Sequence, residues 1–522
     1  MTPSPHDAPP TASPRTVLDL SDITKRFGAL TANDGISLSL AEGEILALLG
    51  ENGAGKTTLM NILFGHYVAD AGTVRVFGEE LPPGKPRAAI EAGVGMVHQH
   101  FTLAGNLTVL DNVILGSEPL FRLASRRREA RAKLTRIAEH FGLPVDPDAR
   151  VASLSVGERQ RVEILKALYG DARILILDEP TAVLAGPEAE RLFATLRTMT
   201  KDGLSIVFIS HKLNEVMAGS DRVVVLRGGK SVAERKTSAT SPSELAELMV
   251  GRRVTRPKRE AQAPGDVVVE AKDVRIVDGD GHPRLDGVGF QVRAGEILGI
   301  VGVSGNGQAA IAGMLTGLAP LASGSLTLAG DDMSRHTPAE LIASGVGRIP
   351  EDRHAEGVVG ELAVWENAVL ERIGAPDFSA RGFVRRTAGR AYARELIEKY
   401  DIRGATSETR TRLLSGGNMQ KLILGRILSA GPRFILANQP TRGLDEGAIA
   451  AVHARLLEAR AAGAAILLIS EELEEAVGLA DRIQAIVKGK LSRPIAAEDA
   501  DARRLGLTMA GVWQEEGASD AA

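Results

Sequence analysis

The sequence contains no cysteine, no long apolar run and little net charge. Without cysteine, disulfide bonds and thiolate metal sites are excluded, and the composition fits a reducing compartment. No apolar run approaches the roughly 18 residues of a membrane-spanning helix; one of the longest, residues 461–470, is expected to be a buried strand with its lead-in. The formal net charge of −4 does not steer the chain toward nucleic acid. The 522 residues are enough for two or more domains with full cores.

A glycine-rich stretch at residues 50–58 fits the phosphate-binding pattern G-x-x-x-x-G-K-[ST] at every fixed position. It follows an apolar strand-like run and precedes the start of a helix, so backbone N–H groups and the helix dipole would face a phosphate. Lys56 is expected to reach the β- and γ-phosphates, and the Thr57 hydroxyl to hold Mg²⁺. A glycine-rich turn that binds nothing is the alternative. The expected binding residues are Gly50, Glu51, Asn52, Gly53, Ala54, Gly55, Lys56, Thr57 and Thr58.

The chain is a repeat of one domain. Gly43 is matched by Gly295, an offset of 252, and Pro180 is matched by Pro440, an offset of 260, so the second copy has gained about eight residues. We expect domain 1 at residues 17–250, a linker at 251–265 and domain 2 at 266–513, with floppy tails at 1–16 and 514–522. The first tail lacks the apolar segment of a signal peptide. The linker is basic, and a lipid or nucleic-acid patch is the alternative to a solvated connector.

Apolar strand-like runs alternate with helical patterns in each copy. Uninterrupted Leu and β-branched runs between helices predict an α/β fold with a parallel sheet covered on both faces. Ligands of such folds lie at the carboxyl ends of the strands. The phosphate loop, Asp178 and His211 all fall there. The runs are residues 45–49, 174–177 and 206–209 in the first copy and 297–301, 434–437 and 466–469 in the second.

Two carboxylates follow the apolar run at residues 174–177. Asp178 is expected to hold Mg²⁺, through water, and Glu179 to polarise the water that attacks the γ-phosphate. Two acids after a strand also serve as plain helix caps. The phosphate loop in the same copy favours the catalytic interpretation.

The sequence before each of these strand ends carries a more specific motif. Residues 154–158 are Leu-Ser-Val-Gly-Glu, and residues 414–418 are Leu-Ser-Gly-Gly-Asn. Together with the loop and the acids, they resemble the L-S-G-G-Q signature of ATP-binding cassette transporter ATPases over nearly all of residues 17–513. The resemblance implies two tandem P-loop NTPase domains, each with a mainly parallel core sheet, an antiparallel β subdomain and a helical subdomain.

In this family two cassettes close head to tail, and each ATP lies between the phosphate loop of one and the signature of the other. The loop at residues 50–58 is therefore implied to face the second signature, whose serine hydroxyl and glycine backbone would donate to the γ-phosphate. The first signature, with Val156 and Glu158, would face the second loop. The ATP contacts implied from the second copy are Ser415, Gly416, Gly417 and Asp445.

The resemblance assigns roles to three further residues of the first copy. Gln99 is implied to sense Mg²⁺ and the γ-phosphate, while the segment after it contacts the membrane partner. His211 resembles the switch histidine that bridges the γ-phosphate and the attacking water, and a structural histidine is the alternative. Phe27 resembles the aromatic residue that stacks on adenine, and a core phenylalanine is the alternative.

The second copy has lost the matching chemistry, because its loop and strand ends lack the charged groups of the first. Hydrolysis is expected at one loop per chain, although the second glycine nest could still hold nucleotide weakly. The replacements are Gln308 for Lys56, Ala309 for Thr57, Asn438 for Asp178, Gln439 for Glu179, Glu471 for His211 and Glu351 for Gln99. The expected catalytic residues are Lys56, Gln99, Glu179 and His211, and the expected Mg²⁺ contacts are Thr57, Gln99 and Asp178.

Fused cassettes with one degenerate half resemble the subfamily that serves bacterial importers of simple sugars and nucleosides. Such ATPases work with two integral membrane permease subunits and an extracytoplasmic substrate-binding protein, and they lie peripherally on the cytoplasmic face of the plasma (inner) membrane. The segments 97–101, 154–157, 161–166, 180–184 and 349–353 favour the nucleoside branch over ribose-like or other simple sugars.

A soluble tandem cassette ATPase acting on ribosomes or DNA is the alternative of another class. Ribosome-acting relatives usually keep both sites and carry a long charged helical linker, and DNA-repair relatives carry cysteine zinc modules. This chain has one intact site, a short linker and no cysteine. A regulatory nucleotide sensor is a third possibility, which the intact hydrolytic set disfavours.

Overall fold

The computed structural model describes residues 15–28, 30–98, 101–116, 126–181, 186–210, 212–251, 257–509 and 511. The chain forms two compact units, Met1–Val254 (unit 1) and Thr255–Ala522 (unit 2). Each unit is described by itself. In the part of the chain that is described, no helix is long and apolar enough to cross a lipid bilayer.

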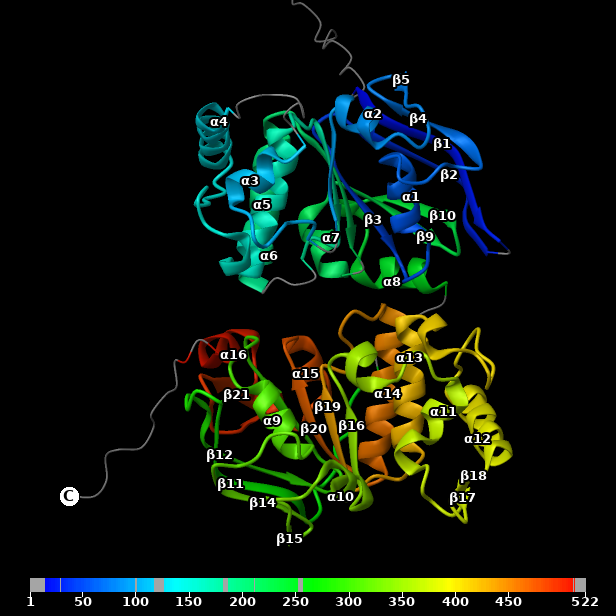
Figure 1. The fold of residues 1–522 in the computed structure, drawn as a ribbon, viewed down its shortest axis with the longest axis vertical. Coiled ribbons are helices and arrows are strands. Elements are labelled where there is room, and N and C mark those ends of the chain that lie inside the picture. The colour runs from blue at the N-terminus through cyan, green and yellow to red at the C-terminus, as the bar shows by residue number, and fades with distance from the viewer. Residues whose placement is uncertain are drawn as a thin grey trace, which may run out of the picture. The chain divides into compact units, whose positions relative to one another are not determined.

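Unit 1 contains a core sheet and a smaller antiparallel sheet (Figure 1). Its strands are β1 (Thr16–Phe27), β2 (Leu30–Ala41), β3 (Ile45–Gly50), β4 (Ala71–Val76), β5 (Glu79–Glu80), β6 (Val94–Val97), β7 (Ile174–Asp178), β8 (Ser205–Ser210), β9 (Arg222–Arg227) and β10 (Lys230–Lys236). The core sheet has the order β10-β9-β3-β8-β7-β6, and the smaller sheet the order β2-β1-β4-β5. Strands β6, β7, β8, β3 and β9 pair in parallel, whereas β10 pairs antiparallel with β9.

The helices of unit 1 cover its core sheet or form a subdomain beside it. They are α1 (Lys56–Leu63), α2 (Pro86–Glu91), α3 (Val109–Ile114), α4 (Arg127–His140), α5 (Val156–Tyr169), α6 (Gly186–Lys201), α7 (Leu213–Gly219) and α8 (Pro242–Val250). Figure 1 places α3, α4 and α5 together, across the core sheet from the antiparallel strands. These three helices form the helical subdomain.

Strand β3 is buried along its whole length because apolar layers cover both of its faces. Ile45, Ala47 and Leu49 pack in one core cluster, together with residues of α5 and α6. Leu46 and Leu48 point to the other face and pack with the antiparallel sheet and α1. The strand that leads into the phosphate loop is therefore held from both sides.

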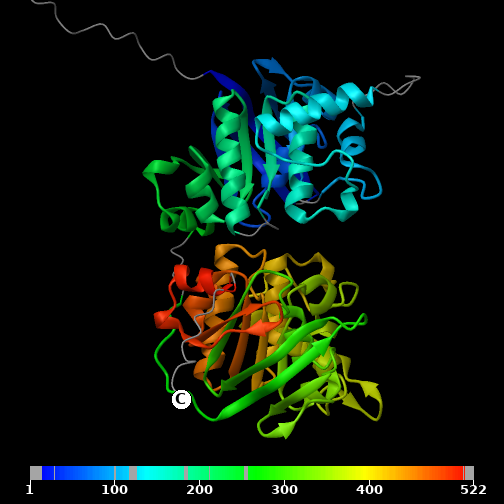
Figure 2. The same cartoon turned by 90° about the vertical axis from the view of Figure 1, so that its left-hand side faces the viewer.

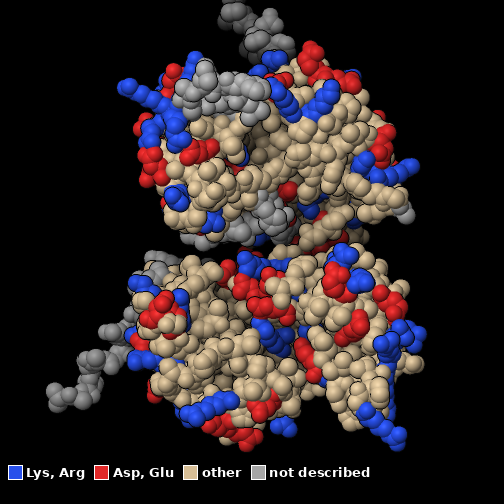
Figure 3. All heavy atoms as spheres, viewed as in Figure 1, with Lys and Arg blue, Asp and Glu red and all other residues tan. Residues whose placement is uncertain are grey.

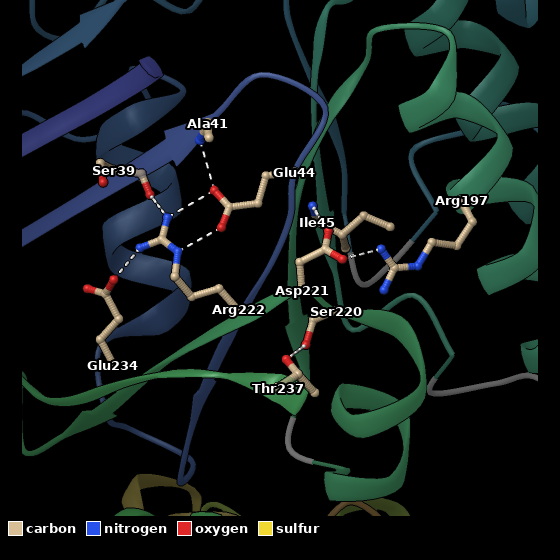
Figure 4. Close-up of polar contacts among 10 residues, drawn as sticks. All are labelled: Ser39, Ala41, Glu44, Ile45, Arg197, Ser220, Asp221, Arg222, Glu234 and Thr237. Atoms are coloured by element: carbon tan, nitrogen blue, oxygen red, sulfur yellow. Dashed lines mark hydrogen bonds and ion pairs between the residues drawn. The ribbon is translucent and has the colours of Figure 1, made fainter. Parts of the chain in front are cut away.

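A polar network fixes the start of β3, at the end opposite the loop (Figure 4). Arg222 Nε donates to Glu44 Oε1 at 2.7 Å, and Arg222 Nη2 donates to the carbonyl oxygen of Ser39 at 2.6 Å. The Glu44 carboxylate raises the pKa of Arg222 above its usual value. Asp221 Oδ2 accepts a hydrogen bond from the N–H of Ile45 at 2.9 Å. The start of β3, the strand that leads into the phosphate loop, is therefore held in place by these hydrogen bonds.

Unit 2 repeats this architecture (Figure 2). Its strands are β11 (Val267–Val277), β12 (Pro283–Arg293), β13 (Ile297–Val301), β14 (Ser323–Leu328), β15 (Asp331–Asp332), β16 (Val346–Ile349), β17 (Ser379–Ala380), β18 (Phe383–Val384), β19 (Phe434–Asn438), β20 (Ala465–Ser470), β21 (Arg482–Val487), β22 (Lys490–Leu491) and β23 (Ile495–Ala496). The core sheet has the order β16-β19-β20-β13-β21-β22, with β23 beside β21, and the antiparallel sheet the order β12-β11-β14-β15. The fold class expected from the sequence is confirmed.

The helices of unit 2 follow the same plan. They are α9 (Gln308–Leu315), α10 (Pro338–Ala343), α11 (Val364–Val369), α12 (Arg386–Lys399), α13 (Gly416–Leu428), α14 (Glu446–Ala461), α15 (Leu473–Leu479) and α16 (Ala502–Met509). Arg482 Nε donates to Glu296 Oε1 at 2.5 Å, and Asp481 Oδ2 accepts from the N–H of Ile297 at 2.8 Å. Arg259, in the expected linker, donates to Asp481 Oδ1 at 2.8 Å, so this part of the linker is bound to unit 2.

Candidate functional site

The glycine-rich loop of unit 1 joins β3 to α1. Gly53 and Gly55 have φ angles of 85° and 98°, in the left-handed region that favours glycine. Gly55 is the N-cap of α1, and a Cβ there would clash with the carbonyl oxygen of Ala32. The loop backbone therefore depends on the glycines of the motif.

Lys56 lies across this loop with only 5% of its surface exposed. Its Nζ donates to the carbonyl oxygens of Gly50 at 2.7 Å and Glu51 at 2.9 Å. The buried amide of Asn33 adds a second brace, because its Nδ2 donates to the carbonyl oxygen of Gly55 at 3.0 Å. Asn33 was not expected from the sequence, because its place in a strand gives no motif by which to identify it.

The carboxyl ends of four parallel strands lie level beside the loop. The order β3-β8-β7-β6 is consecutive, and the register pairs Leu49 with Ser210, Ile209 with Asp178, and Leu177 with Val97. The structure therefore brings Asp178 and Glu179 to the edge that carries the loop. The predicted residues His211 and Gln99 lie outside the described residues.

Asp178 and Glu179 differ in burial and backbone geometry. Asp178 ends β7 and is 4% exposed. Glu179 has a φ of 48°, and its N–H donates to the carbonyl oxygen of Ile209 at 3.1 Å. In unit 2, Gln439 has a φ of 46° and makes the same bond to Ile469 at 2.8 Å. A left-handed conformation costs a non-glycine residue about 1–3 kcal/mol, and such strain clusters at functional sites.

Phe27 ends β1 and is 44% exposed, which excludes the alternative that it is a core residue. Tyr67 lies edge-to-face against it, with ring centroids 5.6 Å apart. Lys25 Nζ lies 5.5 Å from the Phe27 centroid. An exposed ring steadied by two neighbours is suited to stacking on a planar base.

The two units differ in their fit to Mg²⁺. Thr57 and Asp178 offer a hydroxyl and a carboxylate, the oxygen donors that Mg²⁺ prefers, so these residues of unit 1 fit the ion. In unit 2, Ala309 has no ligand atom and Asn438 is neutral. These replacements do not fit it.

The loop of unit 2 keeps its shape but not its charge. Gly305 and Gly307 have φ angles of 88° and 120°. Gln308 Nε2 donates to the carbonyl oxygen of Val303 at 2.9 Å. The buried Oε1 of Gln308 and Oδ1 of Asn438 have no hydrogen-bond partner among the described residues. Unpaired acceptor oxygens disfavour a phosphate anion, which is itself an acceptor.

The two signature serines make opposite hydrogen bonds. Ser155 and Ser415 are the N-caps of α5 and α13. Ser155 Oγ donates to Glu158 Oε2 at 2.8 Å, and this bond holds the pKa of Glu158 below its usual value. Ser415 Oγ instead accepts from Asn418 Nδ2 at 3.0 Å. The Asn418 amide is oriented by the N–H of Arg403, which donates to its Oδ1 at 2.9 Å. Ser415 can therefore donate its hydroxyl hydrogen to another acceptor, whereas the Ser155 hydroxyl already donates a hydrogen bond to a carboxylate.

A buried glutamine ties each signature helix to the segment that follows a core strand, β7 in unit 1 and β19 in unit 2. Gln160 Nε2 donates to the carbonyl oxygen of Pro180, and Gln420 Nε2 donates to that of Pro440 at 2.7 Å. Neither glutamine was expected from the sequence. Their signal is the repeat, because each stands five residues after a signature serine.

A glycine-rich loop after one parallel strand, with acids at the end of a nearby strand, defines a P-loop nucleoside triphosphatase; unit 1 has both features, and unit 2 repeats the fold without the acids. Residues 33–182 and 285–442 each match the family described as ABC transporter. The chain belongs to the ATP-binding cassette (ABC) transporter family. It is an ATPase that binds and hydrolyses ATP.

Curated relatives match this chain over nearly its full length. The nucleoside import ATP-binding protein NupA of Lactococcus lactis is 44% identical over 95% of this chain and 98% of its own. The guanosine import ATP-binding protein NupO of Bacillus subtilis is 44% identical over 96% and 98%. The glucose import ATP-binding protein TsgD13 of Haloferax volcanii is 43% identical over 95% and 96%.

Among solved structures, the archaeal ribosome recycling factor aABCE1, in complex with the ribosomal stalk protein aP1, is similar in fold. It matches with a TM-score of 0.62 at 19% identity, over 94% of this chain and 92% of that chain. At this identity the likeness shows the tandem-cassette fold alone.

Proposed function

We propose that this chain is the ATP-hydrolysing subunit that powers import of nucleosides through a separate membrane permease. The observation that carries the proposal is the 44% identity to two nucleoside import subunits over nearly the whole chain. Import of ribose-like or other simple sugars is the second candidate, supported by a glucose import relative at 43%.

In the proposed mechanism, unit 1 holds the triphosphate. The loop N–H groups and Lys56 bind the β- and γ-phosphates, and Phe27 stacks on the adenine. Glu179 accepts a proton from the attacking water, and its bent backbone aims the carboxylate. His211 and Gln99 complete the set as γ-phosphate contacts.

Mg²⁺ belongs to the same proposal. Thr57 and Asp178 would hold it, with Gln99 as a third contact. When bound, the ion neutralises charge on the phosphates. Hydrolysis in unit 2 is not proposed, because Ala309 and Asn438 do not fit the ion.

We further propose that the signature of unit 2 completes the site of unit 1. The support is the distribution of losses: the intact loop and the intact signature are in different units, as a head-to-tail pairing requires. Ser415 keeps a proton that it can donate to the γ-phosphate, whereas the proton of Ser155 is bound by Glu158. Gly416, Gly417 and Asp445 are the other contacts proposed from unit 2.

The proposed partners are two integral membrane permease subunits and an extracytoplasmic substrate-binding protein, with this chain peripheral on the cytoplasmic face of the inner membrane. The segment after Glu351 corresponds to the one that the family resemblance assigns to partner contact. A cavity of about 130 Å³ lies beside it in unit 2. Its lining includes Leu318, Ile342, Arg348, Pro350, Glu356 and Arg426, a mixture of apolar and charged groups suited to a helix end.

The rival role on ribosomes or DNA has less support. The likeness to the ribosome recycling factor is one of fold alone. On the face drawn in Figure 3, acidic and basic side chains are interspersed, and no extended basic patch covers the described atoms. Phosphate backbones require clustered Lys and Arg.

The test is ATP hydrolysis by the transporter purified with its permease subunits and binding protein. We expect stimulation by the binding protein loaded with guanosine and none with ribose or glucose. Stimulation by a sugar alone would transfer the assignment to sugar import. Hydrolysis that no loaded binding protein changes would contradict a role in transport.

A further inference from the structure

Arg353 begins an extra turn that follows β16 in unit 2. The turn is π-helical and spans Arg353–Gly357. Asp352 caps it: its Oδ1 accepts from the N–H groups of His354 at 2.8 Å and Ala355 at 2.9 Å. These N–H groups hold the pKa of Asp352 below its usual value. The backbone from which Arg353 projects is therefore fixed.

The Arg353 guanidinium lies between two segments that the proposed site uses. Its Nη2 donates to the carbonyl oxygen of Arg442 at 2.5 Å. A Cβ added at Gly443 would lie 3.2 Å from this Nη2, and one added at Gly416 would lie 3.6 Å from the Arg353 Cζ. The guanidinium therefore packs against the signature turn and against the segment that leads to Asp445.

No carboxylate lies within ion-pair distance of Arg353 in the described part of the chain. Glu351, two residues before it, is paired with Arg442. Burial and the nearby Arg442 charge lower the pKa of Arg353 below its usual value, while the charge of Asp352 opposes the shift. A guanidinium stays protonated in proteins, so a positive charge stands beside the signature without a paired carboxylate.

Unit 1 lacks both arginines. Its position 101, in register after the corresponding strand, is Phe101, and the counterpart of Arg442 is Ala182. Unit 1 is also the copy whose signature carries Glu158. The intact signature of unit 2 therefore has arginines near it, whereas the altered signature of unit 1 carries a glutamate.

We propose that Arg353 is a positioning residue for ATP hydrolysis. Its guanidinium joins the signature turn to the segment 442–445 and places a positive charge beside Gly416, the residue after Ser415. The serine and glycine donors are thereby held in one arrangement. The inference rests on the proposed two-sided site.

The experiment measures ATP hydrolysis and ATP binding by the full-length chain with Arg353→Met, Arg353→Gln and Arg353→Lys. We expect the two neutral variants to lower kcat by about tenfold or more, as does loss of a preorganised charge contact. Because Arg353 is assigned to positioning the signature donors and not to contacting the nucleotide, the KM for ATP and the affinity for ATP measured on a Glu179→Gln background should stay within about threefold. Arg353→Lys restores the charge and should regain most of the lost kcat.

Arg390→Met is the matched control, because it removes a unit 2 arginine that pairs with Glu408 away from the signature. A kcat for Arg353→Met and Arg353→Gln equal to that of this control would overturn the inference. So would an Arg353→Lys variant no better than the neutral ones. Gly417→Asp, in the same assay, separates the two proposals. If it leaves kcat unchanged, the proposed two-sided site is wrong. If it abolishes hydrolysis while Arg353→Gln does not, only the proposed role of Arg353 is wrong.

Discussion

Glu158 accepts a hydrogen bond from the hydroxyl of Ser155, and this single contact separates the two signatures chemically. A carboxylate can only accept, so it engages the serine hydroxyl as a hydrogen-bond donor and adds a negative charge to the same turn. In unit 2 the amide of Asn418 donates to Ser415 instead. The fifth residue of the signature thus decides whether the serine hydroxyl can donate to another acceptor or already donates to a carboxylate.

Exchanging this residue should exchange the properties of the two signatures. Asn418→Glu places a carboxylate three residues after Ser415 and should lower ATP turnover by about tenfold or more, ~1.4 kcal/mol of barrier. The reciprocal change Glu158→Asn should leave turnover within about twofold. Steady-state ATPase rates of the full chain measure both. Equal effects of the two changes would contradict the assignment of roles.

Of the two phosphate loops and strand ends, only those of unit 1 should carry hydrolysis. Lys56→Ala and Glu179→Gln are each expected to lower turnover by about 10², roughly 3 kcal/mol of barrier. Gln308→Ala, at the position that corresponds to Lys56, should have little effect. Phosphate release by the purified chain is the measurement, and a strong loss from Gln308→Ala would show that the second loop is active.

Removing the exposed ring at Phe27 should weaken ATP binding without altering chemistry. Phe27→Ala loses a stacking contact worth about 0.5–1.5 kcal/mol, so the KM for ATP should rise by roughly 2–10-fold at unchanged kcat. Phe27→Trp keeps a stacking surface and should restore the KM. A fall in kcat with unchanged KM would instead indicate that the residue acts on the chemical step.

A buried histidine distinguishes the interior of unit 2 from that of unit 1. Glu475 Oε1 lies 3.0 Å from His453 Nε2 and accepts from Thr441 Oγ1 at 2.7 Å, while Glu475 Oε2 accepts from Ser470 Oγ at 2.6 Å. The corresponding residue of unit 1 is Phe193, which packs on Phe208 with centroids 5.4 Å apart. Glu475 thereby links the segment after β19 to the end of β20.

His453→Ala should destabilise unit 2 by about 2–4 kcal/mol, because it leaves a cavity and removes a partner of a buried carboxylate. Both tryptophans of the chain, Trp365 and Trp513, are in the second half, so tryptophan fluorescence in denaturant reports on unit 2. Phe193→Ala is the control and should leave this transition in place. A transition unchanged in His453→Ala would contradict the structural role of the pair.

The cap at Asp352 should contribute stability only while it is ionised. Its pKa is lowered in the folded chain, so the contribution is present above about pH 4 and is lost as pH falls through the folded pKa. Asp352→Ala should therefore unfold at lower temperature than the wild type at pH 7, by a margin that shrinks in acid. Asp352→Asn keeps an acceptor without a charge, and its margin over Asp352→Ala should not depend on pH. Thermal unfolding followed by tryptophan fluorescence tests both expectations.

The sequence predicts the parts of the site that stand at fixed distances from an apolar strand. Lys56 follows β3 and Asp178 ends β7, so pattern and fold class are enough to place them. Asn33 reaches its partner Gly55 across 22 residues through strand packing, which no local pattern records. Glu158 is a different case, because S-x-x-E is a capping-box pattern and its bond to Ser155 was open to prediction. The unpaired charge of Arg353 required coordinates, since it depends on where other carboxylates lie.

The bent backbone at Gln439 indicates the history of the chain. Unit 2 retains the left-handed residue after β19, with a φ within two degrees of that of Glu179, although no acid remains there to be aimed. Such a conformation is expected when a duplicated domain that was once active has its catalytic side chains replaced but keeps its backbone conformation. The substitutions Gln308→Lys, Ala309→Thr, Asn438→Asp and Gln439→Glu would place the lost side chains on a backbone with the conformation seen in unit 1. Unit 2 is therefore a starting point for rebuilding a second hydrolytic site.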